Sequence, residues 1–380
     1  MQRRNGFIAV AALTFALAGC ADTGSNAVPV EPNFSASGGG TAGTVYTMSN
    51  AVAGNEVLIF SRRADGALEA AGSAATGGTG TGSGLGNQGG LVLTDDGRWL
   101  LAVNAGSNSI AVFRVLGQGG LRAAGTVASG GVRPISVTVS GSLVYALNAG
   151  GSGNITGFRL SNDGALTMIA GSTRPLSGAG SGPAQVAFDP SGRVLVVTEK
   201  AANSILTFLV GADGLTSAPR IQASNGDTPF GFAFSQTGVL IVSEAFGGAA
   251  NAGAASSYQV SSGGELSLVS GSVVSAQSAP CWFVITGNSR FAYTSNTQSG
   301  TITGYSVSGG GLSLLNADGV TGRSGAGPID LAISRNSKFL YSLDSGTETI
   351  TAFAVGADGS LQKLGATPGI PDGANGLASR

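Results

Sequence analysis

The chain has 380 residues, of which 10% are charged and 42% are hydrophobic, and its formal net charge is −1. It contains no histidine and only two cysteines. These counts exclude a Ser/His/Asp triad, a Cys/His catalytic pair and every histidine-based zinc site. No run of Lys or Arg occurs, so nucleic acid is not expected as a partner.

Residues 1–19 have the pattern of a secretory signal peptide. Arg3 and Arg4 precede an apolar run, 7–17, that is too short to span a membrane. The segment 17–20 reads Leu-Ala-Gly-Cys. It resembles the bacterial lipobox, in which the cysteine is acylated and becomes the mature N-terminus. An ordinary secretory signal with a chance cysteine is the alternative.

We therefore expect acyl chains on Cys20 to anchor the protein in a lipid bilayer, at about 0.8 kcal/mol for each buried CH₂. Residue 21 is Ala and not Asp, which by resemblance to lipoprotein sorting favours the outer membrane. Residues 20–44 are rich in Gly, Ser and Thr and predict a flexible tether.

A repeat follows the tether. An aromatic residue recurs at the end of a short apolar segment, at intervals of 53, 45, 50, 50, 47 and 48 residues. The seven positions are Phe60, Phe113, Phe158, Phe208, Tyr258, Tyr305 and Phe353. A period of this length is typical of propeller blades or of a solenoid.

A glycine-rich connection, 77–90, lies between the first two aromatic positions. Its residues 84–89 match the G-x-G-x-x-G pattern of nucleotide-binding loops. That pattern needs a strand before it and a helix after it, and neither is predicted here. We therefore expect a flexible loop and no nucleotide site.

Each repeat has the same internal order, which the fourth repeat shows most clearly. Residues 183–188, 194–199 and 203–208 predict three short strands, and Asp213-Gly214 predicts the hairpin turn before a fourth strand. Further repeats open in the same way at Pro134, Pro229, Pro280 and Pro328. Four short strands in a repeat of this length form one blade of a β-propeller.

The two ends of the repeat region complete each other. The first repeat begins at Val45 with a second-position strand. Residues 375–378 at the C-terminus match the first-strand pattern of 329–332. We therefore predict an all-β protein in which residues 45–380 form a single seven-bladed β-propeller of four-stranded antiparallel blades. The C-terminal strand joins the N-terminal blade and closes the ring, which removes free sheet edges.

The repeats resemble the lactonase-like seven-bladed propellers, which include a bacterial type of 6-phosphogluconolactonase and fungal carboxymuconate cyclases. The resemblance covers the whole repeat region and rests on units such as Gly97–Asn104 with Asn108–Phe113. An exported subgroup is similar at 197–200, 228–232 and 281–282. The resemblance implies a lactone hydrolase or lactonising isomerase. Family enzymes use histidine in the site, and this chain has none.

The first strand of each predicted blade begins, and the second ends, at the same rim of the central channel. Glu199 and Glu244 end second strands where four other blades have asparagine. We predict both as catalytic candidates that divide acid and base roles. They could instead hold a divalent cation such as calcium. The structural alternative is two solvated acids or a salt bridge with Lys200.

Other residues at this rim are candidates for ligand binding. Arg133 would bind an anionic group, and Phe230 and Trp282 would stack on a ligand or belong to the core between blades. The remaining candidates are Gln185, Lys200, Asn296 and Asp330. Asparagine at such a position has the alternative role of capping a turn.

Two functions stay open on this reading. One is an envelope-anchored enzyme that acts on a small, anionic lactone or related molecule in the central funnel. The other is a non-catalytic propeller that binds a small molecule or an envelope protein through its wide polar faces. In either case we expect a monomer attached to the bilayer.

Overall fold

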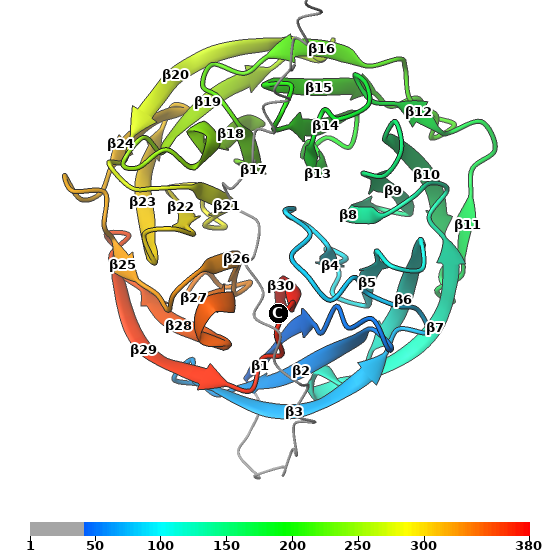
Figure 1. The fold of residues 1–380 in the computed structure, drawn as a ribbon, viewed down its shortest axis with the longest axis horizontal. Coiled ribbons are helices and arrows are strands. Elements are labelled where there is room, and N and C mark those ends of the chain that lie inside the picture. The colour runs from blue at the N-terminus through cyan, green and yellow to red at the C-terminus, as the bar shows by residue number, and fades with distance from the viewer. Residues whose placement is uncertain (1–41) are drawn as a thin grey trace, which may run out of the picture.

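A computed structural model of the chain describes residues 42–380. Seven antiparallel sheets are arranged as a ring around a central channel (Figure 1). Each sheet has its first strand at the channel and its last strand at the circumference, as the repeat predicts. The predicted signal peptide, most of the predicted tether and Cys20 lie outside the described residues.

We number the blades in chain order. Blade 1 contains β30 (Asn375–Ser379), β1 (Gly43–Met48), β2 (Glu56–Arg62) and β3 (Leu68–Ala75). Blade 2 contains β4 (Leu91–Leu93), β5 (Trp99–Asn104), β6 (Ser109–Val115) and β7 (Leu121–Ala128). Blade 3 contains β8 (Pro134–Ser140), β9 (Leu143–Asn148), β10 (Asn154–Leu160), β11 (Leu166–Met168) and β12 (Arg174–Pro175).

The remaining blades follow the same order. Blade 4 contains β13 (Pro183–Phe188), β14 (Val194–Glu199), β15 (Ser204–Leu209) and β16 (Arg220–Ala223). Blade 5 contains β17 (Pro229–Phe234), β18 (Val239–Glu244), β19 (Ala254–Val260) and β20 (Leu266–Val274). Blade 6 contains β21 (Pro280–Ile285), β22 (Phe291–Asn296), β23 (Thr301–Ser308), β24 (Gly311–Leu314) and β25 (Gly322–Arg323). Blade 7 contains β26 (Pro328–Ile333), β27 (Phe339–Asp344), β28 (Thr349–Val355) and β29 (Leu361–Pro368).

Helices contribute little to the described part of the chain. Residues 42–380 contain three single-turn 3-10 helices, η1 (Gly117–Gly119), η2 (Phe246–Gly248) and η3 (Ser345–Thr347). Within this range, no helix has the length and apolar character needed to cross a bilayer.

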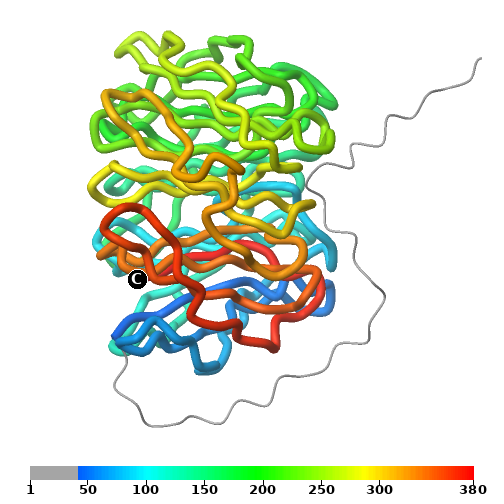
Figure 2. Tube along the Cα trace, turned by 90° about the vertical axis from the view of Figure 1, so that its left-hand side faces the viewer, coloured from blue at the N-terminus to red at the C-terminus, as the bar shows by residue number. Residues whose placement is uncertain are grey.

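The ring is closed as the sequence predicts. β30 pairs antiparallel with β1, with Tyr46 opposite Ala378 and Thr47 opposite Leu377. Figure 2 shows the red C-terminal end beside the blue first strand. The last strand is therefore the inner strand of blade 1, and β1 is paired along both of its edges.

The core lies between the blades and comes from the second and third strands. All seven repeat aromatics are buried, with Phe60, Phe113, Phe208 and Tyr305 among the least exposed side chains. Every second strand from blade 2 to blade 7 is buried along its whole length. β-Branched and aromatic residues dominate these strands because both of their faces pack against neighbouring blades.

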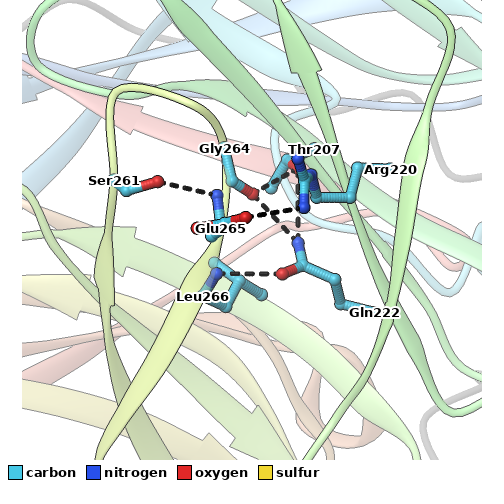
Figure 3. A network of polar contacts seen from close by, with 7 residues as sticks. All are labelled: Thr207, Arg220, Gln222, Ser261, Gly264, Glu265 and Leu266. Carbon is cyan, nitrogen blue, oxygen red and sulfur yellow. Dashed lines mark hydrogen bonds and ion pairs between the residues drawn. The ribbon is translucent and has the colours of Figure 1, made fainter.

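Polar contacts near the circumference also join neighbouring blades, as Figure 3 shows for blades 4 and 5. Gln222 on β16 donates from Nε2 to the carbonyl of Gly264 at 3.0 Å and accepts the N–H of Leu266 at 2.9 Å. Arg220 on the same strand pairs with Glu265 at 3.0 Å. The Arg220 side chain is 50% exposed and the Glu265 side chain 64%. The partly buried contacts of the Gln222 amide therefore contribute more specificity than the ion pair.

Candidate functional site

One hydrogen bond recurs at the rim of the channel. In blades 3 to 7, the carbonyl of the residue before the opening proline accepts the N–H of the residue that follows the second strand, at 2.8–3.0 Å. The acceptor–donor pairs are Arg133 and Ala149, Gly182 and Lys200, Thr228 and Ala245, Ala279 and Thr297, and Gly327 and Ser345. This bond ties the start of the first strand to the end of the second strand and so shapes the rim.

Two of these ten positions carry a charge. Arg133 is the only charged residue before a proline, and Lys200 is the only charged residue after a second strand, whereas the other eight are Gly, Ala, Ser or Thr. Both charged residues line one pocket of about 190 Å³ between blades 3 and 4, which we call the rim pocket. The repeated bond needs only backbone atoms, so folding does not require a charge at either position.

Arg133 occupies a backbone conformation that favours glycine. Its φ is +56°, and the N–H donates to the side-chain oxygen of Asn108 at 2.7 Å. Thr228 of blade 5 has the same arrangement, with φ of +58° and a 2.7 Å bond to Asn203. Gly182 takes the equivalent position in blade 4 with φ of +67° and no strain. Ala279 of blade 6 has the same conformation with φ of +55°, so the strain is common to three blades and the charge alone distinguishes Arg133.

Lys200 is held by neutral groups. Its ammonium donates to the carbonyl of Gly86 and, at 3.4 Å, to the carbonyl of Pro183, and it lies 4.5 Å from the centre of the Phe230 ring. Burial and the neighbouring Arg133 guanidinium lower the pKa of Lys200 to about 7. The two carbonyls and the ring favour the charged form, because all three attract a cation.

No carboxylate neutralises these two cations. Within residues 42–380, the ion pairs join Arg63 to Asp65 and Glu69, Arg98 to Asp96, and Arg220 to Glu265. The rim pocket is therefore electropositive, and part of its wall is the glycine-rich loop 178–182. The arrangement can bind a small anion.

Larger depressions lie on the opposite face, among the hairpins. One of about 240 Å³ lies between blades 2 and 3, where Arg98 is paired with Asp96. Another of about 510 Å³ lies between blades 4 and 5 and carries one arginine, Arg193. Neither brings two unpaired cations together, so the smaller rim pocket is the better candidate.

The two predicted catalytic acids are buried and bound to loops. Glu199 accepts the N–H of Ser177 at 3.1 Å and also its hydroxyl, and Ser177 lies in the connection that enters blade 4. Glu244 accepts the N–H of Gly226 at 2.8 Å and the hydroxyl of Ser272 at 2.7 Å. Each carboxylate thus fixes the loop that leads into its own blade. That they also take part in chemistry stays a prediction.

The same structural role extends to other second-strand ends. Asp344 of blade 7 accepts the N–H of Gly325 at 3.0 Å together with three hydroxyls. Burial raises its pKa, and these donors oppose that shift. Asn296 donates to Thr301 and Thr303 within blade 6 at 3.0 and 2.9 Å. Among residues 42–380, no three Asp, Glu, Cys or His side chains gather closely enough to hold a metal ion.

The predicted aromatic pair lies inside the channel wall. Phe230 and Trp282 are each 1% exposed, and their ring centres are 5.1 Å apart. Lys200 contacts the Phe230 ring, so the structure brings these three predicted residues together. In this conformation the two rings pack on each other and not on open space.

Inner-strand side chains complete a belt of hydrogen bonds around the channel. In blades 4 to 7, the pairing between the first and second strands shifts just after the opening proline. This shift leaves one backbone N–H free to donate to a side chain. Gln185 accepts the N–H of Phe232 at 2.7 Å and donates to its carbonyl at 3.1 Å. Asp330 accepts the N–H of Leu331 at 2.8 Å and that of Leu377, while burial raises its pKa well above the usual range.

Sequence reasoning missed one segment of the site. The glycine-rich connection is expected to be a flexible loop, but its residues Leu85–Gln88, which we call the strap, extend into the channel (Figure 1). Gln88 accepts the N–H of Phe283 at 2.8 Å and donates to its carbonyl at 2.6 Å. Asn87 is 1% exposed and its carbonyl accepts the indole N–H of Trp282. Two adjacent carboxamides within a glycine run were the available signal.

The sequence pattern of one family matches almost the whole propeller. It is the "Lactonase, 7-bladed beta-propeller" family, and the matches cover residues 45–176, 152–246 and 245–370. The chain belongs to this family. The resemblance expected from the repeats is thereby confirmed. No curated protein matches the chain.

Solved structures of the same shape are distant in sequence. A protein from Lactobacillus plantarum superposes with a TM-score of 0.72 at 18% identity, over 89% of this chain and 99% of the other. A candidate 6-phosphogluconolactonase from Bacteroides uniformis gives 0.70 at 20% identity, over 89% and 99%. A periplasmic gluconolactonase from Pseudomonas aeruginosa gives 0.67 at 14% identity, over 87% and 98%. At these identities the likeness establishes the shared fold.

The loop-anchoring role of the two glutamates predicts how they respond to substitution. Glu199→Gln and Glu244→Gln each keep one carbonyl oxygen for the backbone N–H but lose the negative charge and replace the oxygen that accepts the serine hydroxyl with an N–H donor. We therefore expect each to lower the free energy of unfolding by about 1–3 kcal/mol. The loop held by Glu199 lines the rim pocket and the loop held by Glu244 does not. Denaturant unfolding measures both losses, and limited proteolysis should cut the pocket-lining loop 178–182 faster in Glu199→Gln alone. Two variants as stable as the parent would contradict the loop-anchoring role.

Proposed function

We propose that this lactonase-family propeller binds a small anionic molecule in the rim pocket. The observation that carries the proposal is the meeting of Arg133 and Lys200 in one pocket with no carboxylate partner. An arginine fork can hold a carboxylate or a phosphate with two parallel bonds, and the lysine adds a second charge.

The pocket also offers backbone donors. Within residues 42–380, the amides of Gly180 and Gly182 have no protein acceptor, and both residues have positive φ. The amide between them, of Ser181, donates to the carbonyl of Gly178 at 3.4 Å, so two separate donors remain for an anionic oxygen. Some structural relatives are described as acting on gluconolactone or its phosphate. Sugar acids and their lactones are therefore the ligand class that we propose for this chain.

Hydrolysis of a lactone is the second candidate function. Of the described residues that line the rim pocket, only Arg133 and Lys200 have ionisable side chains. With its pKa lowered to about 7, Lys200 can give up its proton near neutral pH and accept one from an attacking water. Arg133 would then hold the anionic end of the substrate, and the Gly180 and Gly182 amides would stabilise the developing oxyanion.

We further propose that the propeller is attached to the outer membrane through an acylated Cys20. Support comes from the lipobox-like sequence at 17–20 and from the glycine- and serine-rich segment that follows it. The structure begins to describe the chain at residue 42, close to β1 in blade 1.

Replacing Arg133 by glycine should separate binding from folding. Gly182 and Gly327 already occupy this position in other blades, so Arg133→Gly should leave the free energy of unfolding unchanged or raise it by up to about 1 kcal/mol. Calorimetry with gluconate and 6-phosphogluconate should show affinity reduced tenfold or more, because a charge-assisted pair is lost. Thr228→Gly relieves the same strain outside the pocket and is the matched control. Full affinity in Arg133→Gly would refute the proposed site.

The pKa of Lys200 gives opposite pH dependences for the two candidate functions. A ligand held by the lysine charge should bind more weakly as pH rises through about 7, because the ammonium is lost. Lactone turnover with Lys200 as the base should instead rise over the same range. Affinity and rate measured from pH 6 to pH 9 decide between them. Lys200→Arg keeps the charge and should flatten the affinity profile while abolishing turnover.

If Cys20 anchors the protein, replacing its sulfur atom by oxygen should abolish membrane attachment. Cys20→Ser replaces the thiol that would carry the acyl chains, so the protein should move from the membrane fraction to the soluble fraction. Labelling with a radioactive fatty acid should give a signal for the parent protein and none for the variant. Equal labelling of both would rule out acylation at this residue.

A further inference from the structure

The strap contacts three blades, 3, 4 and 6, through a short run of polar contacts. Gln88 donates its N–H to the carbonyl of Ala184 at 3.1 Å in blade 4, and its side chain pairs with Phe283 in blade 6. Asn87 donates from Nδ2 to the carbonyl of Ile135 in blade 3. The strap itself belongs to the connection between blades 1 and 2. It therefore spans the mouth of the channel from one side to the other.

The strap occupies space that the channel wall leaves open for it. A Cβ placed on Gly231 would lie 2.1 Å from Oε1 of Gln88 and 2.4 Å from the carbonyl oxygen of Cys281, so both the strap and the first strand of blade 6 need a glycine here. Gly231 follows the opening proline of blade 5 by two residues, the position that Gln185 holds in blade 4. Gln185 caps the free amide of the next blade, and Gly231 cannot. The side chain of Gln88 supplies the missing cap to Phe283 from outside the strand.

Leu85 anchors one end of the strap, because it is 5% exposed and belongs to the hydrophobic core. Hydrogen bonds hold the remaining residues, 86–88, and glycines border the strap at Gly84 and Gly89. Gly86 and Gly89 have positive φ, so the backbone turns within and just after the strap. A segment that depends on hydrogen bonds with little apolar burial opens at lower free energy than the packed strands around it.

The strap and the rim pocket share two residues. Leu85 lines the pocket wall, and the Lys200 ammonium that faces the pocket is bonded to the carbonyl of Gly86. An anion in the pocket competes with that carbonyl for the ammonium protons. A bond between two charged groups is stronger than one from an ammonium to a neutral carbonyl, so the anion takes precedence.

We propose that the strap is a ligand-responsive lid over the channel mouth, released when an anion in the rim pocket draws Lys200 away from Gly86. This inference rests on the proposed anion site. Release of the strap frees the indole N–H of Trp282, the amide and carbonyl of Phe283 and the space beside Gly231. These groups suit the oxygen-rich remainder of the bound anion, which then extends from the rim into the channel.

Trp282 reports the state of the lid. The chain has two tryptophans, and the other, Trp99, lies among the hairpins of the opposite face. In a Trp99→Phe background, emission comes from Trp282 alone. Saturating gluconate or 6-phosphogluconate should shift this emission to longer wavelength and increase quenching by acrylamide at least twofold, because the indole loses its cover of strap atoms.

Two variants should open the lid without ligand. Gln88→Ala removes the pairing with Phe283, and Lys200→Met removes the bond to Gly86, so both should show the red-shifted and more quenchable Trp282 in buffer alone. Gln222→Ala is the matched control, because it removes a glutamine with the same kind of double bond to a neighbouring blade at the circumference. Its Trp282 emission should equal that of the parent.

The outcomes separate the lid from the proposed function. Calorimetric binding with no change at Trp282 overturns the lid and leaves the anion site standing. Absence of binding to the parent overturns the anion site. The lid is then overturned as well if Trp282 in Gln88→Ala and Lys200→Met is as shielded as in the parent.

Discussion

The hydrogen bond between the carbonyl before each opening proline and the amide after each second strand determines the geometry of the rim. This bond holds the start of the first strand beside the end of the second strand. It requires a positive φ at the acceptor residue, a conformation that is strained for residues other than glycine. From blade 3 to blade 7 the rim is therefore a series of nearly identical backbone turns, and a departure from small side chains there is easily recognised.

Repetition makes the exceptional residues informative. Eight of the ten positions joined by this bond carry small uncharged side chains, and the two charged ones meet in a single pocket. A propeller of seven similar blades has seven similar boundaries where a ligand could bind, and they differ only in their side chains and loops. In this chain the two charged residues distinguish the boundary between blades 3 and 4, where the strap also contacts the rim.

The fold could be predicted almost completely from the sequence, because the spacing of buried aromatics and of Asp-Gly turns reports strand order directly. Closure could be predicted as well, since residues 375–378 repeat an inner-strand pattern. The site was harder. Glu199 and Glu244 stand out in the sequence, yet their burial against Ser177 and Gly226 depends on loops whose path no local pattern gives. The strap was missed because glycine content signals freedom, whereas the contacts of Asn87 and Gln88 come from distant blades.

Gly231 has a consequence for how members of this family can vary. The amide of Phe283 needs one acceptor, and a Cβ at position 231 would collide both with Oε1 of Gln88 and with the carbonyl oxygen of Cys281. A propeller with glutamine at this position, as Gln185 is placed one blade earlier, would need both the loss of the strap and a blade 6 backbone that lies farther away. A long glycine-rich connection before the second blade should therefore accompany a glycine at this position across the family.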